Sequence, residues 1–357
     1  MRPARALINL KALHHNYHYA KSLAPHSKAA AIIKANAYGH GAIVVARALH
    51  DADAFGVACI EEALELREAG ITQPIVLLEG VFTPDELPLA ARYQLMVAVH
   101  CVEQVIWLEQ AKLIQPLAVW LKIDTGMHRL GFAPEQVASI YARLNACSHV
   151  ATITLMTHFA RADEVECEAT TRQIERFNKA IQGIDAPLSI ANSPAILAWP
   201  KARLDWVRPG IMLYGATPIA EDLAVSQELQ PVMTLESALI SVRELDVGES
   251  IGYGARFTCE QPTRVGVVAM GYADGYPRHA VDGTPVAVNG VRTRIIGRVS
   301  MDMLTVDLTP LPQAKVGDRV ELWGNMVLAN EVAAHSQTIA YTLFTGITRR
   351  VPLVYQY

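Results

Sequence analysis

The chain alternates nearly continuous apolar runs with segments of helical periodicity, and this rhythm constrains the fold more than any other feature. Apolar runs without polar alternation are typical of parallel strands that are covered on both faces. Eight strand and helix units predict a (β/α)8 barrel of the TIM type rather than an open doubly wound sheet. The eight runs that we count lie at 28–36, 54–60, 74–80, 95–100, 117–124, 150–160, 187–193 and 204–215.

The rhythm changes after about residue 216. The following segments are strand-like and are separated by turn signals such as Asn289-Gly290, a favoured hairpin dipeptide. One helical pattern, at 330–344, and a last apolar run, at 350–355, complete the chain. The pattern of this part therefore predicts a mainly β structure.

These two patterns predict an α/β chain of two domains. We expect residues 1–225 to form the barrel and residues 226–357 to form a mainly β C-terminal domain, with a polar linker around 218–231. The opening run, 6–10, is surplus to the eight barrel strands. We expect it to pair elsewhere, with the C-terminal domain as the candidate.

The composition excludes several classes of protein. A chain of 357 residues, 51% hydrophobic and 18% charged, is globular rather than disordered. A net charge of -4 without long Lys/Arg blocks argues against nucleic-acid and membrane partners, so we expect small molecules or further copies of the chain. The five cysteines are scattered, which argues against disulfides and zinc, and neither a secretory signal nor a membrane span is predicted. These features predict a reduced, cytoplasmic protein.

Polar side chains follow the predicted strands at the points where the strands end. Barrel active sites collect at the carboxyl ends of the strands, so these side chains should converge. Two lysines, an arginine and a histidine on one rim suit an anionic, phosphorylated ligand. The set consists of Lys34, Asn36, Lys122, Asp124, His158, Asn192, Ser193 and Arg208.

A lysine at the end of a buried strand indicates a function, because desolvating its ammonium group costs free energy that packing of its side chain does not return. A desolvated lysine near other cations has a lowered pKa and becomes a nucleophile that can form a Schiff base. Pyridoxal phosphate fits this rim, since it offers an aldehyde, a phosphate and a ring nitrogen. A barrel aldolase with a Schiff-base lysine satisfies the same chemistry, so the residues alone do not choose the cofactor.

Several motifs together carry a family resemblance. The segments "AIIKANAYGHGA", "LKIDTGMHRLGF", "MTHFARAD", "ANSPA", "DWVRPGIMLYG", "IGYGARF", "GYADGYPR" and "GRVSMDM" occur in this order over about residues 5–353. In this order they closely resemble the alanine racemase family of bacterial, pyridoxal-phosphate-dependent isomerases. The resemblance implies interconversion of L- and D-alanine, for peptidoglycan supply or for D-alanine degradation.

The resemblance implies two acid/base groups on opposite faces of the substrate Cα, as inversion requires. Lys34 resembles the lysine that holds pyridoxal 5'-phosphate and acts on one face. Tyr253 resembles the second base, which in the family comes from the other subunit, so a homodimer with composite sites is implied. By similarity Arg208 faces the pyridine nitrogen, and an arginine there keeps that nitrogen unprotonated.

Further roles follow from the resemblance alone. The phosphate is expected at Tyr38, Ser193 and the backbone amides of Gly210 and Ile211. Met301 resembles a backbone contact of the substrate carboxylate, and Tyr272 resembles a tyrosine that narrows the entrance. The remaining cofactor contacts that it implies are Arg129, which also faces the substrate, His158 and Asn192.

The state of Lys122 has two alternatives. In several family members this lysine is carbamylated and orients the arginine that corresponds to Arg129, which removes the repulsion between two neighbouring cations. Asp124 is the alternative source of negative charge. One departure from the family concerns Arg349, which stands where some relatives place a phosphate-binding tyrosine, so we do not carry that contact over.

Two other functions use the same cofactor. A barrel decarboxylase of basic amino acids usually has a "GGG" phosphate loop, which this chain lacks. A non-catalytic pyridoxal-phosphate carrier is typically the barrel alone, so the β-rich part and Tyr253 argue against it. The histidine cluster His14, His15 and His18 falls on a predicted helix without matching acidic ligands, which favours an ordinary surface helix over a metal site.

Overall fold

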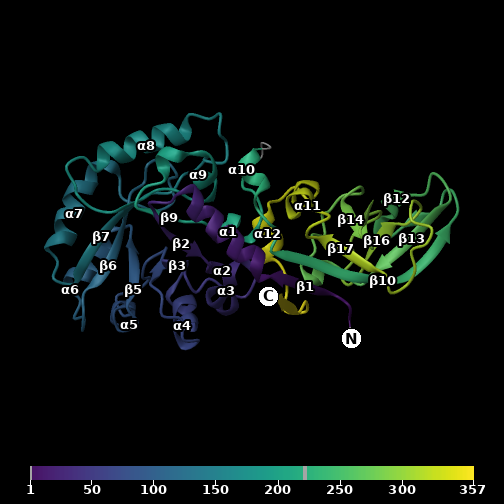
Figure 1. The fold of residues 1–357 in the computed structure, drawn as a ribbon, viewed down its shortest axis with the longest axis horizontal. Helices are drawn as coiled ribbons and strands as arrows, with labels where there is room; N and C mark the ends of the chain where they lie inside the picture. The colour runs from purple at the N-terminus through teal and green to yellow at the C-terminus, as the bar shows by residue number, and fades with distance from the viewer. Residues whose placement is uncertain (1, 220–222) are drawn as a thin grey trace.

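A computed structural model describes residues 2–219 and 223–357, so residues 220–222 of the predicted linker lie outside the described residues. Figure 1 shows an elongated molecule, with an α/β barrel at one end and a β-rich part at the other. Within the described residues no helix is long and apolar enough to cross a membrane.

The eight predicted runs form the eight parallel strands of one sheet, in the order β8-β7-β6-β5-β4-β3-β2-β9. The ends of this sheet, β8 and β9, meet through a hydrogen bond from the Arg208 N–H to the Ala191 carbonyl (2.9 Å), which nearly closes a barrel. The predicted (β/α)8 fold is therefore confirmed. The strands are β2 (Lys28–Ile32), β3 (Ala54–Val57), β4 (Ile75–Leu77), β5 (Leu95–Val99), β6 (Leu117–Lys122), β7 (Val150–Met156), β8 (Leu188–Ser189) and β9 (Trp206–Val207).

Two layers of apolar packing hold the barrel. Inside it, Trp120 of β6 reaches across to Trp206 of β9, with ring centroids 5.6 Å apart. Outside it, amphipathic helices bury their apolar faces against the strands. These helices are α3 (Ala42–Ala48), α4 (Ile60–Glu68), α5 (Glu86–Arg92), α6 (Val102–Gln110), α7 (Val137–Ala146), α8 (Ala169–Ala180) and α9 (Ser193–Ala198).

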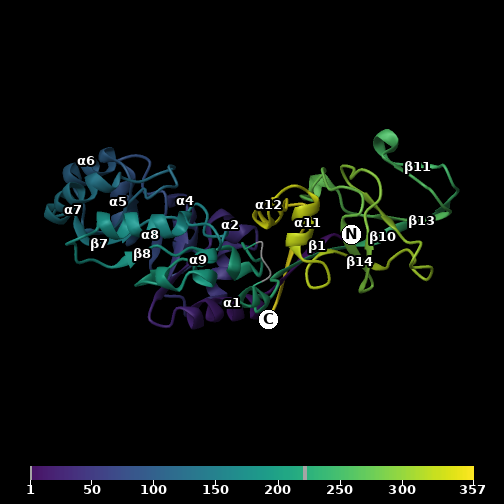
Figure 2. The ribbon, with the colours of Figure 1, turned by 90° about the horizontal axis from the view of Figure 1, so that it is seen from above.

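The opening run forms β1 (Arg5–Asn9), which lies outside the barrel, as expected. It pairs antiparallel with β10 (Met233–Leu245) and parallel with β18 (Leu353–Gln356), so both ends of the chain enter the β-rich part. Helix α1 (Leu10–Leu23) then returns to the barrel, and Figure 2 shows β1 and α1 from above. The division at residue 225/226 stays a prediction.

The β-rich part is built around the long central strand β10. Its buried Glu236 accepts hydrogen bonds from Arg5 of β1, at 2.6 Å, and from Arg319 of β17, so one carboxylate ties three strands together. The other elements are β11 (Ser250–Ile251), β12 (Phe257–Thr258), β13 (Thr263–Val268), β14 (Pro285–Val288), β15 (Val291–Arg294), β16 (Leu304–Asp307), β17 (Arg319–Trp323) and α10 (Ala224–Gln227).

The helical pattern at 330–344 forms two helices rather than one. Helix α11 (Ala329–His335) ends where Gln337 takes a left-handed φ of 49°, and α12 (Ala340–Thr345) starts after this turn. The Thr338 N–H closes the turn on the Ala333 carbonyl at 3.0 Å. The turn directs α12 against the barrel, where it packs on the segment that follows β2.

Gly39 brings the backbone of this segment close to α12. Its φ is 79°, and a Cβ atom there would lie 2.2 Å from the Phe344 carbonyl oxygen. We expect Gly39→Ala to lower the free energy of unfolding by about 2 kcal/mol or more, from left-handed strain and displaced backbone. Gly183→Ala is the matched control, because Gly183 has a φ of 81° and open space around it. Denaturant unfolding should show a loss of about 1 kcal/mol in the free energy of unfolding of that control. An equal loss in both variants would contradict the close packing at Gly39.

Candidate active site

The structure brings the predicted polar side chains to one rim of the barrel. Lys34 follows β2, Lys122 is the last residue of β6, and His158 lies two residues beyond β7. Ser193 and Arg208 lie just after β8 and β9. Since parallel strands of a barrel all end on the same side, these groups share one mouth.

Lys34 begins an unusual turn, labelled α2 (Lys34–Tyr38). The four residues after the lysine, Ala35 to Tyr38, have φ angles of 52–53°, which is a left-handed turn without glycine. Each such residue costs roughly 1–2 kcal/mol, so the surrounding structure must hold the turn. Backbone strain at this position is an observation that points to a functional site.

Hydrogen bonds from three directions hold this turn. The Ala35 N–H donates to the Glu62 carboxylate at 2.6 Å, which ties the turn to α4. The Asn36 side chain accepts from the Ala42 N–H at 2.8 Å, and the Asn36 carbonyl accepts from the Gly41 N–H at 3.0 Å. Lys34 is thereby fixed at the mouth of the barrel.

Burial and nearby positive charges lower the pKa values of both lysines. Desolvation, followed by the charge of Arg129, lowers the pKa of Lys34. Desolvation and the charges of Arg208 and Arg129 lower the pKa of Lys122 to about 8. The neutral amine of each lysine is therefore more accessible near neutral pH than in a free lysine.

Neutral acceptors hold the two terminal nitrogens of the Arg208 guanidinium. Its guanidinium donates to the Ser189 carbonyl (2.8 Å), to the Ser189 hydroxyl (2.7 Å) and to the Thr157 carbonyl (2.7 Å), and burial lowers its pKa to about 10. It also lies 3.4 Å from Nδ1 of His158, whose pKa is well below its usual value because of burial and the Arg208 charge. His158 is therefore neutral, with Nδ1 as the acceptor and its proton on Nε2.

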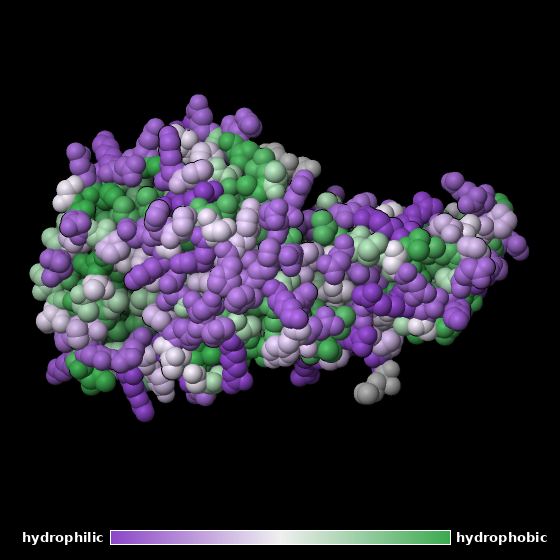
Figure 3. All heavy atoms as spheres, in the orientation of Figure 1, coloured by the Kyte–Doolittle hydropathy of each residue, from purple (hydrophilic) through white to green (hydrophobic). Residues whose placement is uncertain are grey.

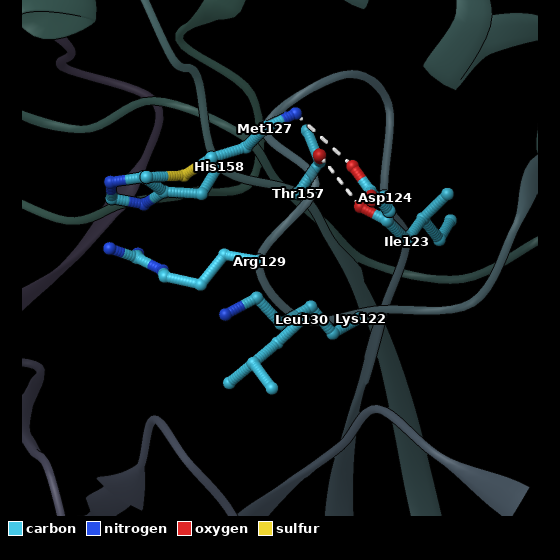
Figure 4. Close-up of a pocket in the computed structure, with 8 residues that line it drawn as sticks. All are labelled: Lys122, Ile123, Asp124, Met127, Arg129, Leu130, Thr157 and His158. Carbon is cyan, nitrogen blue, oxygen red and sulfur yellow. Dashed lines mark hydrogen bonds between the residues drawn. The ribbon is translucent and has the colours of Figure 1, made fainter.

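Asp124 does not neutralise the lysine. Its carboxylate accepts from the N–H groups of Gly126, Met127 and His128 at 3.0–3.1 Å, and Figure 4 shows the Arg129 side chain extending away from it. Glu79 is the acidic group that partly offsets the charge of Lys122. Among residues 2–219 and 223–357 no carboxylate forms an ion pair with any of the rim cations, Lys34, Lys122, Arg129 and Arg208.

A cradle of small polar groups adjoins this positive rim. The Ser193 hydroxyl accepts from the N–H groups of Gly210 (2.8 Å) and Met212 (3.4 Å), so its own proton is free to be donated. A Cβ atom at Gly210 would lie 2.9 Å from the Tyr38 hydroxyl, so only glycine leaves this space open. Because Gly210 N–H is already engaged, Ile211 N–H and the two hydroxyls are the donors that could face a phosphate.

Two residues at this site differ from simple expectation. Asn192 caps α9, because its side chain accepts from the Ala195 N–H at 3.3 Å. Tyr341 of α12, which our sequence reasoning missed, packs against Tyr38 with ring centroids 5.8 Å apart. Its only sequence signal was an aromatic residue within an ordinary helical pattern.

Arg349, for which no phosphate contact was carried over from the family, is exposed.

Three predicted residues lie in the β-rich part, away from this rim. Tyr253 lies between β11 and β12, at the end of the molecule opposite the barrel, and is 71% exposed. Met301 is also exposed, and its carbonyl accepts from the Ala273 N–H next to Tyr272 (2.9 Å). Within one chain the structure therefore pairs Met301 with Tyr272 and does not bring Tyr253 to Lys34.

Comparisons with known proteins cover both parts of the chain. Residues 8–218 match the family model "Alanine racemase, N-terminal domain", and residues 232–355 match "Alanine racemase, C-terminal domain". The alanine racemase of Pseudomonas taetrolens and the catabolic alanine racemase of Pseudomonas putida are each 58% identical over 356 residues, with 99% of both chains covered.

Solved structures agree along the whole length. The biosynthetic alanine racemase of Pseudomonas aeruginosa superposes with a TM-score of 0.97 at 50% identity, covering 100% of both chains. The alanine racemase of Acinetobacter baumannii superposes with a TM-score of 0.95 at 41% identity, also covering 100% of both chains. The chain therefore belongs to the alanine racemase family.

Proposed function

We propose that this chain is an alanine racemase that interconverts L- and D-alanine with pyridoxal 5'-phosphate as a homodimer. The observation that carries the proposal is the lysine of lowered pKa at the mouth of the barrel, in a chain similar to alanine racemases over its whole length. A cytoplasmic location stays a prediction.

The residues at the mouth fit the cofactor. Four cations without an ion-paired carboxylate favour an anionic ligand, and the open space at Gly210 beside the Tyr38 hydroxyl suits a phosphate. When bound, the cofactor supplies an electron sink that acidifies the Cα proton of an attached amino acid. The residues that would hold it are Lys34, Tyr38, Arg129, His158, Asn192, Ser193, Arg208 and Ile211, and Gly210 would leave the space for its phosphate.

Lys34 is proposed as the acid/base on one face of the Cα. Its lowered pKa makes the neutral amine available, and the turn after β2 fixes where the amine can reach. No acceptor among the described residues engages the Nε–H of Arg208, so this group would donate a hydrogen bond to the ring nitrogen of the cofactor. Because arginine does not lose its proton at neutral pH, the ring nitrogen would stay unprotonated.

Tyr253 is proposed as the acid/base on the other face, contributed by a second copy of the chain. It is far too exposed for a core tyrosine, and other apolar side chains of the β-rich part are exposed too, namely Val281, Met301 and Met303. Figure 3 shows apolar surface at this end of the molecule. A second copy placing this surface over the mouth would complete the site with Tyr253, Met301 and Tyr272. Neutral His158 would support a tyrosinate there by hydrogen bonding rather than by charge.

The first test is exchange of the Cα proton in D2O. Wild-type protein with pyridoxal phosphate should exchange and invert L-alanine, as followed by NMR and chiral chromatography. Tyr253→Phe should lower inversion by about 100-fold or more, because the second face loses its acid/base, while D-alanine still exchanges through Lys34. Tyr357→Phe is the control, since Tyr357 is similarly exposed, at 82%. Absence of exchange by the cofactor-loaded wild type would reopen the decarboxylase and carrier alternatives.

The composite site has its own test. Lys34→Ala and Tyr253→Phe should each be nearly inactive as homodimers. When the two are co-refolded in equal amounts, a mixed dimer carries one intact site, so we expect about a quarter of wild-type activity from random assembly. Activity no higher than that of the separate variants would reject a site shared between subunits.

We also propose that Lys122 is carbamylated. Asp124 is engaged by backbone N–H groups, so a carbamate on Lys122 is the better source of negative charge beside Arg129 and Arg208. The neutral amine would add to CO2 and release one proton, leaving an anionic carbamate. This modification would turn mutual repulsion into attraction.

The carbamate predicts a carbon signal after incubation with 13C-bicarbonate. Wild-type protein should show one carbamate resonance, and Lys122→Ala should lack it. Since the pKa of Lys122 is lowered to about 8, the neutral amine and the signal should diminish as the pH falls below about 8. A signal that persists in Lys122→Ala would place the carbamate elsewhere. Lys21→Ala, which removes a lysine paired with Asp53, is the control.

The relatives also support a proposal about whether the chain serves D-alanine degradation or peptidoglycan supply. Identity is 58% and 56% to the relatives named catabolic, from Pseudomonas putida and Pseudomonas aeruginosa, and 50% to the structure named biosynthetic. This favours D-alanine degradation over peptidoglycan supply, although the reversible reaction serves either.

A further inference from the structure

Two histidines and an aspartate converge on the outer surface of the barrel. His14 and His18 are one turn apart on α1, and Asp51 lies in the loop between α3 and β3. The Oδ2 atom of Asp51 lies 2.9 Å from Nε2 of His18 and 3.8 Å from Nε2 of His14, and the two Nε2 atoms are 3.1 Å apart. The sequence alone shows no acidic partner for these histidines, because Asp51 is distant along the chain.

These spacings match those of metal ligands. Ligand atoms that each lie about 2.0–2.2 Å from a tetrahedral Zn²⁺ stand roughly 3.3 Å from one another. The three separations, 2.9, 3.1 and 3.8 Å, lie on both sides of that value. We propose that His14, His18 and Asp51 bind a transition-metal dication of the Zn²⁺ class. Two imidazoles disfavour Mg²⁺ and Ca²⁺, which prefer oxygen ligands.

The three side chains are already positioned by their neighbours. The His18 ring packs edge-on against buried Tyr17, with centroids 5.6 Å apart, and His14 stacks with His50 at 6.4 Å. The loop that carries Asp51 is fixed where the Asp53 N–H donates to the Tyr17 hydroxyl at 3.2 Å. Little ordering is therefore needed when an ion binds.

The site would stabilise the fold and would take no part in the chemistry. Asp51 precedes β3, so the cluster lies at the amino ends of the strands, opposite the rim that carries Lys34. A bound ion would join α1 to the loop before β3, and the partly exposed side chains leave room for water as a further ligand.

The test is a Zn²⁺ titration of the tag-free, cofactor-loaded protein by calorimetry. We expect one saturable ion per chain in the wild type, and affinity weakened at least about tenfold in His18→Ala and in Asp51→Asn. His15→Ala is the matched control on the same helix, because His15 contacts the Glu228 carbonyl (3.0 Å) and lies outside the cluster. Zn²⁺ should raise Tm by about 2–4 °C in the wild type and the control alone.

Two results would overturn the site. One is the absence of saturable Zn²⁺ binding by the wild type. The other is Zn²⁺ binding by both cluster variants as tight as that of the wild type, as expected if cysteines or the active-site rim captured the ion. EPR of the Cu²⁺-loaded protein adds an independent check, because two-nitrogen coupling is expected in the wild type and its loss in His18→Ala. Alanine turnover should be unchanged in all three variants, which separates this test from that of the proposed function.

Discussion

Positive charge gathered at one mouth of the barrel is the constraint around which this molecule is organised. Lys122 and Arg208 are buried, yet no acidic side chain in the described part of the chain is ion-paired with either. Backbone carbonyls and a serine hydroxyl hold Arg208 in place, so its charge is oriented but not cancelled. Such an arrangement is costly alone and favourable with an anion, which suits a site for a phosphate and an amino-acid carboxylate.

The same site stores backbone strain beside its lysine. The left-handed turn after Lys34 is held by Glu62 of α4, by Asn36 itself and by the close contact of Gly39 with α12. Helix α12 belongs to the C-terminal segment, so both parts of the chain contribute to the position of the lysine. Favourable contacts elsewhere in the fold hold this strained turn, and with it a lysine whose pKa is lowered, in place.

Much of the fold could be predicted because one physical rule generates it. Strands covered on both faces appear in the sequence as apolar runs, and the carboxyl ends of parallel strands meet on one side. Lys34, Lys122, His158 and Arg208 could therefore be grouped from their positions in the sequence. The break at Gln337 could not be predicted, because the helical periodicity continues through it. The hydrogen bonds from its own loop to Asp124 could not be predicted either. In the sequence Asp124 stands close to Lys122 and Arg129, so a counter-ion role was an equally reasonable interpretation.

Local sequence was enough to specify the barrel, the β-rich part and the polar residues at the ends of the barrel strands, because periodicity and residue type are local properties. Which groups face one another was decided by tertiary packing. It placed Tyr341 against Tyr38, set Asp51 beside the histidines of α1, and left Tyr253 distant from Lys34 within one chain. Contacts between residues far apart in sequence depend on how the helices and strands pack, and local pattern carries no record of that packing.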